Sequence, residues 1–227
     1  MRFIHEQSGE FRFQLLLVCL FGAVLIPPYF EGHSWFGLVW KVVFTLVLLA
    51  SAYSVIRMRK LYRPALVLMI PTVITVWLEF YVDQNEWVFY LDNLTTIGFM
   101  GFIGYHFLRY ILECRVVTTN VIYASMCLYL ILAIMWAAIY ANIHLFYDGA
   151  FNFSNEHLVV DDHYDERIMG VFSYYSFVTL STLGYGDITP INKVAQAWVS
   201  VEAMIGQFYI AIIMARLVSM HAKSDKQ

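Results

Sequence analysis

Six mostly apolar stretches, each about 20 residues or longer, restrict what this chain can fold into. A helix needs about 20 consecutive apolar residues to cross the hydrocarbon core of a bilayer. The stretches cover residues 13–30, 36–56, 64–82, 87–112, 119–147 and 195–220. Hydrophobic residues make up 60% of the chain and charged residues only 14%, too apolar a composition for one water-soluble core. We therefore expect an all-α membrane protein with six transmembrane helices.

The distribution of charged residues predicts the orientation, because short cytoplasmic loops are rich in Lys and Arg. Basic residues precede the first stretch, separate the second from the third, follow the fourth and close the chain: Arg2, Arg12, Arg57, Arg59, Lys60, Arg63, Arg109, Arg115, Arg216, Lys223 and Lys226. The opposite connections are acidic, with Glu31, Asp83, Glu86, Asp148, Glu156, Asp161, Asp162, Asp165 and Glu166. We expect a multi-pass protein of the plasma membrane, or of the cell inner membrane in a bacterium, with both termini cytoplasmic.

The run TLSTLGYGDITP, Thr179 to Pro190, interrupts the apolar pattern between a short apolar segment, 169–181, and the last stretch. Irregular backbone is tolerated at membrane depth only where it is buried in protein or lines a wet cavity. At 1.5 Å per residue, the preceding segment makes a helix that crosses about half of the bilayer. The carboxyl end of such a helix carries a partial negative charge, which favours a cation. We expect a re-entrant pore helix followed by a loop that lines an aqueous path.

Two glycines in this loop, Gly184 and Gly186, give it an unusual backbone. Glycine adopts positive φ without steric cost. Alternating glycine with other residues lets the carbonyl groups of Thr182, Leu183, Gly184 and Tyr185 point to one side. Four chains around an axis would then form stacked rings of oxygens that replace the water shell of an ion. One chain alone cannot form such rings, so we expect a tetramer.

The sequence Thr182-Leu183-Gly184-Tyr185-Gly186-Asp187 resembles the TVGYGD selectivity filter of the potassium-channel pore family. The likeness runs from Tyr174 through Pro190 into the last stretch and covers about the final third of the chain. It implies a six-span, prokaryotic-type potassium channel with the topology of voltage-gated channels and without a cytosolic regulatory domain. It also implies K⁺ as the permeant ligand, bound at Thr182, Leu183, Gly184 and Tyr185. Leu183 stands where valine is usual, but its side chain should point away from the pore.

Several residues are expected to support the filter. Asp187 at the outer mouth is expected to accept a hydrogen bond from Tyr174 or Tyr175, which stand where many voltage-gated relatives carry two tryptophans. Glu202 lies within the last stretch, and a carboxyl group inside a membrane is a functional hypothesis by default. It either accepts hydrogen bonds behind the filter, from hydroxyls such as those of Ser176, Thr179 or Ser181, or takes part in proton-sensitive gating.

The last stretch resembles the inner helix of bacterial potassium channels, with Gly206 at the usual hinge position. A glycine inside a helix costs about 1 kcal/mol relative to alanine, so a bend or a close helix crossing would account for it. Simple tight packing is the alternative to a gating hinge. Counting helical turns from Gly206 places Gln207, Ile210 and Met214 on the face toward the cavity.

The expected organisation is a four-helix transmembrane module, 1–117, a pore domain, 118–221, and a short cytoplasmic tail, 222–227. The module has the topology of a voltage sensor but lacks its arginine-rich fourth helix, because Arg109 is the only fixed positive charge in 87–112. Weak or absent voltage gating is therefore expected. The expected partners are three identical subunits and membrane lipids, with no nucleic acid and no organic cofactor.

Other functions stay open at this point. A weakly selective cation channel or a membrane sensor would share much of this sequence pattern. A membrane enzyme or transporter subunit could use Asp92, His106 and Arg109 as a proton-relay set. However, Asp92 and His106 are separated by about 21 Å along one helix, so the two side chains cannot meet within it. We therefore expect no catalytic residues.

Overall fold

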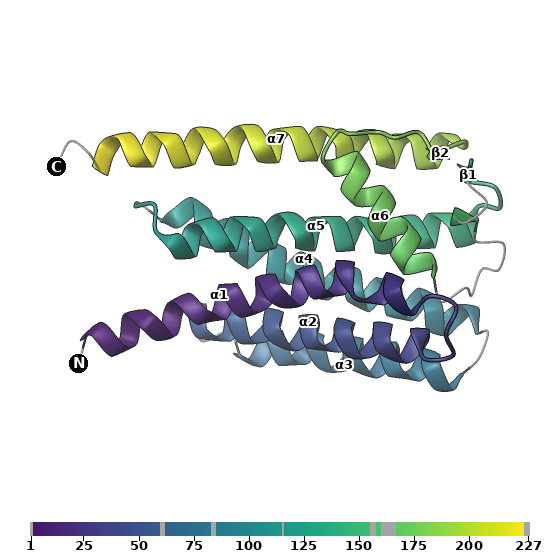
Figure 1. Cartoon of the computed structure of the whole chain (residues 1–227), viewed down its shortest axis with the longest axis horizontal. Coiled ribbons are helices and arrows are strands. Elements are labelled where there is room, and N and C mark those ends of the chain that lie inside the picture. The colour runs from purple at the N-terminus through teal and green to yellow at the C-terminus, as the bar shows by residue number, and fades with distance from the viewer. Residues whose placement is uncertain are drawn as a thin grey trace.

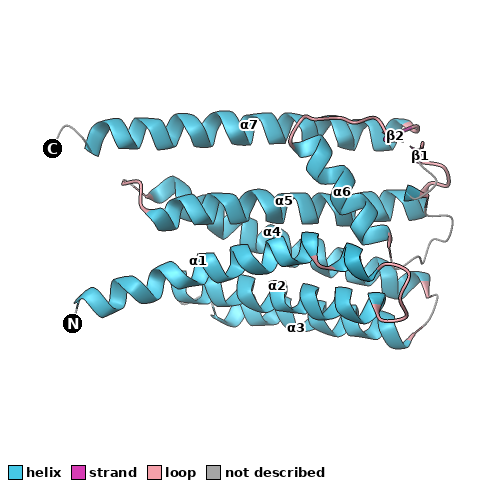
Figure 2. Ribbon diagram, viewed as in Figure 1, coloured by secondary structure: helices cyan, strands magenta, loops and turns pink. Residues whose placement is uncertain are grey.

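The computed structural model describes residues 2–59, 62–82, 85–114, 116–154, 158–159 and 167–224. Within these ranges the chain is almost entirely helical (Figure 2). The long helices are α1 (Arg2–Leu25), α2 (Phe36–Arg59), α3 (Tyr62–Tyr81), α4 (Glu86–Glu113), α5 (Thr119–Phe146) and α7 (Lys193–Ser224). The shorter elements are the 3-10 helix η1 (Pro27–Phe30), the strand β1 (Phe151–Phe153), helix α6 (Ile168–Leu180) and the strand β2 (Ile188–Pro190).

The element boundaries agree closely with the apolar stretches, except at both ends of α1 and at the end of α7. Helix α1 begins at Arg2, eleven residues before the first stretch. The first stretch was expected to stay helical to residue 30, but α1 ends at Leu25 and η1 follows. Pro27 and Pro28 explain this ending, because proline has no amide hydrogen with which to continue an α-helix. At the other end of the chain, α7 continues to Ser224, into the predicted tail.

Some of the charged residues used to predict the orientation lie outside the described residues. They are Lys60, Asp83, Arg115, Lys226 and, in the acidic outer loop, Glu156, Asp161, Asp162, Asp165 and Glu166. In the described part, both chain ends lie at one end of the helical bundle (Figure 1). The carboxyl end of α2 and the amino end of α3 lie at this same end, whereas η1, β1 and β2 lie at the opposite end (Figure 1).

Helix α6 differs from the long helices in its direction. The long helices run along the bundle, whereas α6 is inclined to them and stops within the bundle (Figure 1). The chain then turns and returns beside α7 to β2, at the end from which α6 started (Figure 1). The structure therefore has the re-entrant helix and loop expected from the sequence.

Four segments of the described chain are long and apolar enough to cross a membrane: Phe11–Phe30, Phe36–Ile56, Thr119–Phe146 and Lys193–Arg216. In α3 the apolar part is shorter, covering Arg63–Leu78. Helix α4 carries several polar residues, among them Asp92, Asn93, Thr95, Thr96 and His106. The chain is thus an all-α membrane protein, and the count of six spans stays a prediction.

One apolar core joins the first four helices to α5. It contains Phe13 of α1, Leu48 of α2, Phe99 of α4 and Ile131 of α5, all of them buried. Residues 114–118 alone separate α4 from α5 in the sequence. The two helices pack directly against each other. The predicted boundary at residue 117 lies in this short connection, and the division into two domains stays a prediction.

A second, aromatic core holds α6 against α5. The ring centroids of Tyr140 and Tyr175 are 5.3 Å apart, and those of Phe151 and Phe172 are 5.0 Å apart, both pairs edge to face. Aromatic pairs in this geometry contribute about 0.5–1.5 kcal/mol beyond the burial of their area. The position of α6 is therefore set mainly by α5 and α7, and the aromatic residues of β1 add to this core.

Candidate functional site

The backbone of the segment 182–186, called the filter segment below, alternates in conformation. Thr182, Gly184 and Gly186 have φ values of 60°, 59° and 78°, whereas Leu183 and Tyr185 between them do not have positive φ. The positive φ expected at both glycines is confirmed. Thr182 was not anticipated, because positive φ is uncommon for residues other than glycine. Such alternation turns successive carbonyl groups toward one side, which is the arrangement that coordinates a dehydrated cation.

The two glycines of the filter segment are required by conformation and not by crowding. A Cβ atom added to Gly184 or Gly186 would meet no atom within 4 Å in this chain. The left-handed region costs other residues roughly 1–2 kcal/mol each. An alanine at either position would therefore strain the backbone while fitting the available space.

The filter segment begins on the carboxyl end of α6. The amide of Leu183 donates to the carbonyl of Val178 at 3.0 Å, and the amide of Thr182 donates to the carbonyl of Thr179 at 2.9 Å. The last carbonyl groups of a helix have no partner within it. Here they hold the filter segment in place, so the carboxyl end of α6 positions the segment as well as carrying partial negative charge.

Asp187 fixes the outer end of the filter segment. The hydroxyl of Tyr174 on α6 donates to its carboxylate at 2.5 Å. The amide of Ile188 donates to the other carboxylate oxygen at 3.1 Å, and the amide of Ser154 donates to the Asp187 carbonyl at 2.8 Å. Of the two tyrosines considered from the sequence, Tyr174 is therefore the partner of Asp187.

A two-stranded antiparallel sheet continues this outer anchor. Strand β1 pairs with β2, with Phe153 opposite Ile188 and Phe151 opposite Pro190. The amide of Ile191 also donates to the carbonyl of Ala150 at 2.8 Å. The sequence analysis did not anticipate this sheet, because three-residue strands give too short an alternation to recognise.

Tyr175 has a different environment from Tyr174. Its side chain is buried in the aromatic core, with its ring centroid 5.6 Å from that of Phe151. It supports the filter segment by fixing α6 and not through Asp187.

Glu202 of α7 is fully buried, at 0% exposure, and joins three helices. Its carboxylate accepts hydrogen bonds from the hydroxyl of Ser176 on α6 and from the hydroxyl of Tyr140 on α5. Ser176 was among the expected donors, whereas the hydroxyl of Ser181 donates to a backbone carbonyl of α6 instead. Tyr140 was missed, because nothing in the sequence distinguishes it from the other tyrosines of the chain.

Gly206 of α7 lies against the end of α6. A Cβ atom added to it would be 2.1 Å from the carbonyl oxygen of Leu180. Any larger residue would therefore push α7 away from α6. This close contact supports the packing alternative for Gly206, and the gating hinge stays a prediction.

The residues expected on the cavity face lie on an exposed side of α7. Gln207 is exposed, and the side chains of Ile210 and Met214 are 46% and 56% exposed. The latter two also line an apolar groove of about 500 Å³, together with Tyr129 of α5. Whether this face borders a cavity depends on the neighbouring subunits, so their role stays a prediction.

The three residues of the alternative proton-relay set have different partners. Asp92 accepts a hydrogen bond from Thr75 at 2.9 Å, and the ring of His106 packs on Phe102. Arg109 forms an ion pair with Glu113 on the same helix. Within the described ranges, no group of three or more His, Cys, Asp or Glu side chains could hold a metal ion.

Comparison with known proteins identifies a likeness in the second half of the chain. Residues 128–223 match a family model described as "Ion channel". The matched part includes most of α5, all of α6, the filter segment and nearly all of α7. No curated protein and no solved structure matches the chain. The family match supports an ion channel in a membrane and points away from an enzyme.

Proposed function

We propose that the chain is one subunit of a homotetrameric, potassium-selective channel that conducts K⁺ passively across the plasma membrane. K⁺ is the permeant ligand, coordinated by carbonyl oxygens of Thr182, Leu183, Gly184 and Tyr185. The observation that carries the proposal is the alternation of positive φ at Thr182, Gly184 and Gly186. A row of carbonyl groups facing one side has the chemistry to replace the hydration shell of K⁺.

Exposure of the filter segment supports the tetramer. Leu183 is 56% exposed and Tyr185 is 67% exposed in the single chain. These residues have irregular backbone, whose polar groups cannot face lipid, so another part of the assembly must cover them. Helix α7 beside it carries large exposed apolar side chains, which are Trp198, Val201, Met204, Ile205, Phe208, Ile210, Ile212, Met214 and Val218. Four copies arranged around an axis next to α7 would enclose the filter segments and cover much of this apolar surface.

The ends of the bundle support cytoplasmic termini. The end that holds both termini also holds the carboxyl ends of α2, α4 and α7, with Arg109 and Arg216 among their basic residues (Figure 1). The opposite end holds Glu31 and Asp148, and the filter segment leads to it. In this orientation the outer mouth of the filter is extracellular.

Ion flux into liposomes that contain the purified protein tests the proposal. K⁺ uptake should be fast, and uptake in the same assay with Na⁺ should be close to that of empty liposomes. The variant Gly184→Ala should lose selective K⁺ uptake, because alanine is strained at its φ of 59°. The matched control is Gly98→Ala on α4, where an added Cβ meets nothing within 4 Å and φ is not positive.

Each other outcome contradicts the proposal in a recognisable way. Equal uptake of K⁺ and Na⁺ would indicate a weakly selective cation channel. No uptake of either ion would favour a sensor or a transporter subunit. Full selectivity in Gly184→Ala would mean that the carbonyl rings are not the selective element.

A further inference from the structure

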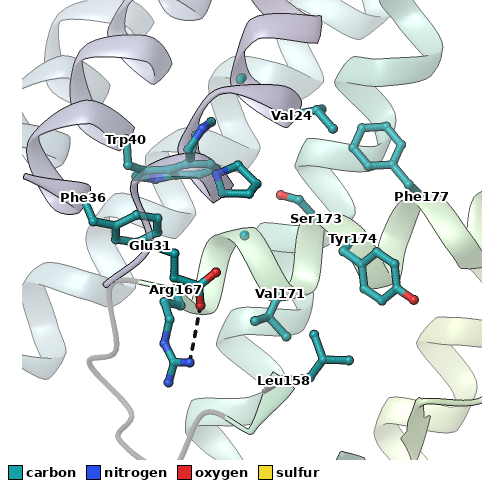
Figure 3. A pocket seen from close by; sticks show the side chains of 14 residues that line it. Val24, Glu31, Phe36, Trp40, Leu158, Arg167, Val171, Ser173, Tyr174 and Phe177 are labelled. Atoms are coloured by element: carbon teal, nitrogen blue, oxygen red, sulfur yellow. Dashed lines mark ion pairs between the residues drawn. The ribbon is translucent and has the colours of Figure 1, made fainter. Parts of the chain in front are cut away.

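A pocket of about 370 Å³ lies between α6 and the first two helices, at the outer end of the bundle (Figure 3). Trp40 and Phe36 of α2 form one wall, and Ser173, Tyr174 and Phe177 of α6 form the other (Figure 3). Ligand sites in proteins have volumes of roughly 300–1,000 Å³ and are mainly apolar with a few polar groups. This pocket has both properties.

The pocket exists because α6 does not pack on the first two helices. Helix α6 packs on α5 and α7 and makes little direct contact with α1 or α2. A small second cavity extends the space toward Phe44 of α2 and Ile134 of α5, and it shares Val24, Trp40 and Phe177 with the pocket. This second cavity holds only about 10 Å³, but the lining of both spaces is mainly apolar, so an apolar occupant suits them.

The mouth of the pocket lies at the level expected for lipid headgroups. Tyr29 and Trp35, on either side of Glu31 in the sequence, are 82% and 67% exposed. Exposed Tyr and Trp residues at the end of a transmembrane bundle mark the membrane interface. The occupant therefore has access to the bilayer and can place a polar head at its interface.

Two opposite charges stand at this mouth. Arg167 Nη1 and Glu31 Oε1 are 3.5 Å apart, with about a third and a half of their side chains exposed (Figure 3). An ion pair this open to solvent contributes little, so the two charges can separate to receive another pair, while Arg167 Nη2 keeps its hydrogen bond to the Val159 carbonyl at 3.3 Å. A guanidinium group suits phosphate, and a carboxylate suits an ammonium group.

We propose that this pocket binds one acyl chain of a zwitterionic phospholipid, whose phosphate contacts Arg167 and whose ammonium group contacts Glu31. The acyl chain lies along α6 between Trp40 and Phe177. The membrane supplies this ligand at high local concentration, and the pair of charges matches its neutral headgroup. The site is built within one chain, and its occupation does not depend on ion conduction.

Native mass spectrometry of the protein extracted from vesicles tests this site. The vesicles contain equal amounts of phosphatidylethanolamine and phosphatidylglycerol, and the bound lipids are counted and identified by mass. The parent protein should retain phosphatidylethanolamine in preference. Gly170→Phe should lose it, because Gly170 lines the pocket and an added Cβ meets nothing within 4 Å, so the ring can enter the space.

A matched control separates filling of the pocket from a general effect of the larger residue. Gly98→Phe adds the same side chain to an exposed, unobstructed position of α4 and should retain lipid as the parent does. If Gly170→Phe does not assemble, Ser173→Leu fills the same pocket from the next turn of α6. A parent protein without bound lipid, or a pocket-filling variant that binds as much as the parent, would overturn the proposal.

The headgroup preference gives a second test. Glu31→Gln removes the negative charge that Arg167 faces, so the retained lipid should shift from phosphatidylethanolamine toward phosphatidylglycerol. An unchanged preference would contradict the assignment of Arg167 and Glu31 to the headgroup. Because the readout is bound mass and not current, a protein that binds the lipid but does not conduct K⁺ would contradict the proposed function alone.

Discussion

The hydroxyl of Tyr174 and the carboxylate of Asp187 show how single residues hold the filter segment. Their 2.5 Å hydrogen bond joins α6 to the outer end of the segment. Hydrogen bonds to charged groups are roughly twice as strong as neutral ones. Tyr174→Phe should therefore speed the loss of current during sustained opening, as recorded from the protein in planar bilayers. Tyr175→Phe is the matched control and should keep the time course of the parent, since the Tyr175 ring packs in the aromatic core. Equal time courses for Tyr174→Phe and the parent would argue against the brace.

Substitution of Glu202 tests whether its carboxyl group has a structural role or senses protons. Glutamine keeps the shape of the side chain, and the hydroxyls of Tyr140 and Ser176 can either donate to it or accept from it. Glu202→Gln should therefore conduct as the parent does at every pH in a pH series of liposome fluxes. A pH response of the parent that disappears in Glu202→Gln would instead identify Glu202 as the titrating group. Glu202→Leu leaves both hydroxyls without an acceptor, so it should destabilise the protein by about 1–3 kcal/mol for each.

Substitution of Gly206 tests whether this glycine allows α7 to pack closely on α6 or acts as a gating hinge. The Cβ of Gly206→Ala would meet the Leu180 carbonyl oxygen at 2.1 Å, and overpacking typically costs about 1–3 kcal/mol. Thermal unfolding should therefore begin at a lower temperature in Gly206→Ala than in the parent. Gly170→Ala is the control, because its Cβ has open space and alanine favours a helix by about 1 kcal/mol. Unchanged stability of Gly206→Ala together with altered opening would favour the hinge.

Among the helices, α4 is the one whose charges determine how strongly voltage can act on the channel. Arg109 Nε lies 2.6 Å from Glu113 Oε1, so the one fixed positive charge in 87–112 is paired with a carboxylate on the same helix. Each elementary charge that crosses the membrane field contributes about 2.3 kcal/mol per 100 mV. Full movement of Arg109 in four subunits would therefore supply only about 9 kcal/mol per 100 mV. Conductance should change only shallowly between about −100 and +100 mV, since a true sensor has three or four such charges in each subunit. A steep activation that disappears in Arg109→Gln would contradict this.

The elements themselves were largely predictable, because apolar length and glycine placement are local signals. Span lengths predicted the long helices, Pro27-Pro28 explains where α1 ends, and Gly184 and Gly186 predicted the irregular backbone. The hydrogen bonds of Glu202 with Ser176 and of Asp187 with Tyr174 were among those expected, but most contacts between distant residues were not predictable. Arg216 of α7 donates to the carbonyl groups of Ile111 and Cys114 at the end of α4, about a hundred residues earlier in the sequence. No periodicity in either segment carries that information.

For the whole molecule, the sequence predicted that a single chain cannot form the complete ion path. Contacts within the chain account for Tyr174, Tyr175, Glu202 and Gly206, but the filter segment and one side of α7 remain exposed. In a bilayer, exposed irregular backbone needs protein or water beside it. The proposed assembly of four copies would meet that requirement. The pocket beside α6 could not be predicted, because nothing in the sequence indicated that α6 would stand apart from α1 and α2.

The reversal potential under bi-ionic conditions tests the central claim most directly. Purified protein in a planar bilayer would separate KCl on one side from NaCl at equal concentration on the other. If the carbonyl groups of 182–185 coordinate K⁺ in a tetramer, the current should reverse far from 0 mV, with the sign set by K⁺ movement, and the K⁺-selective current should be absent in Gly184→Ala. Reversal of the parent current near 0 mV would mean that K⁺ and Na⁺ pass equally well, and this would contradict the account.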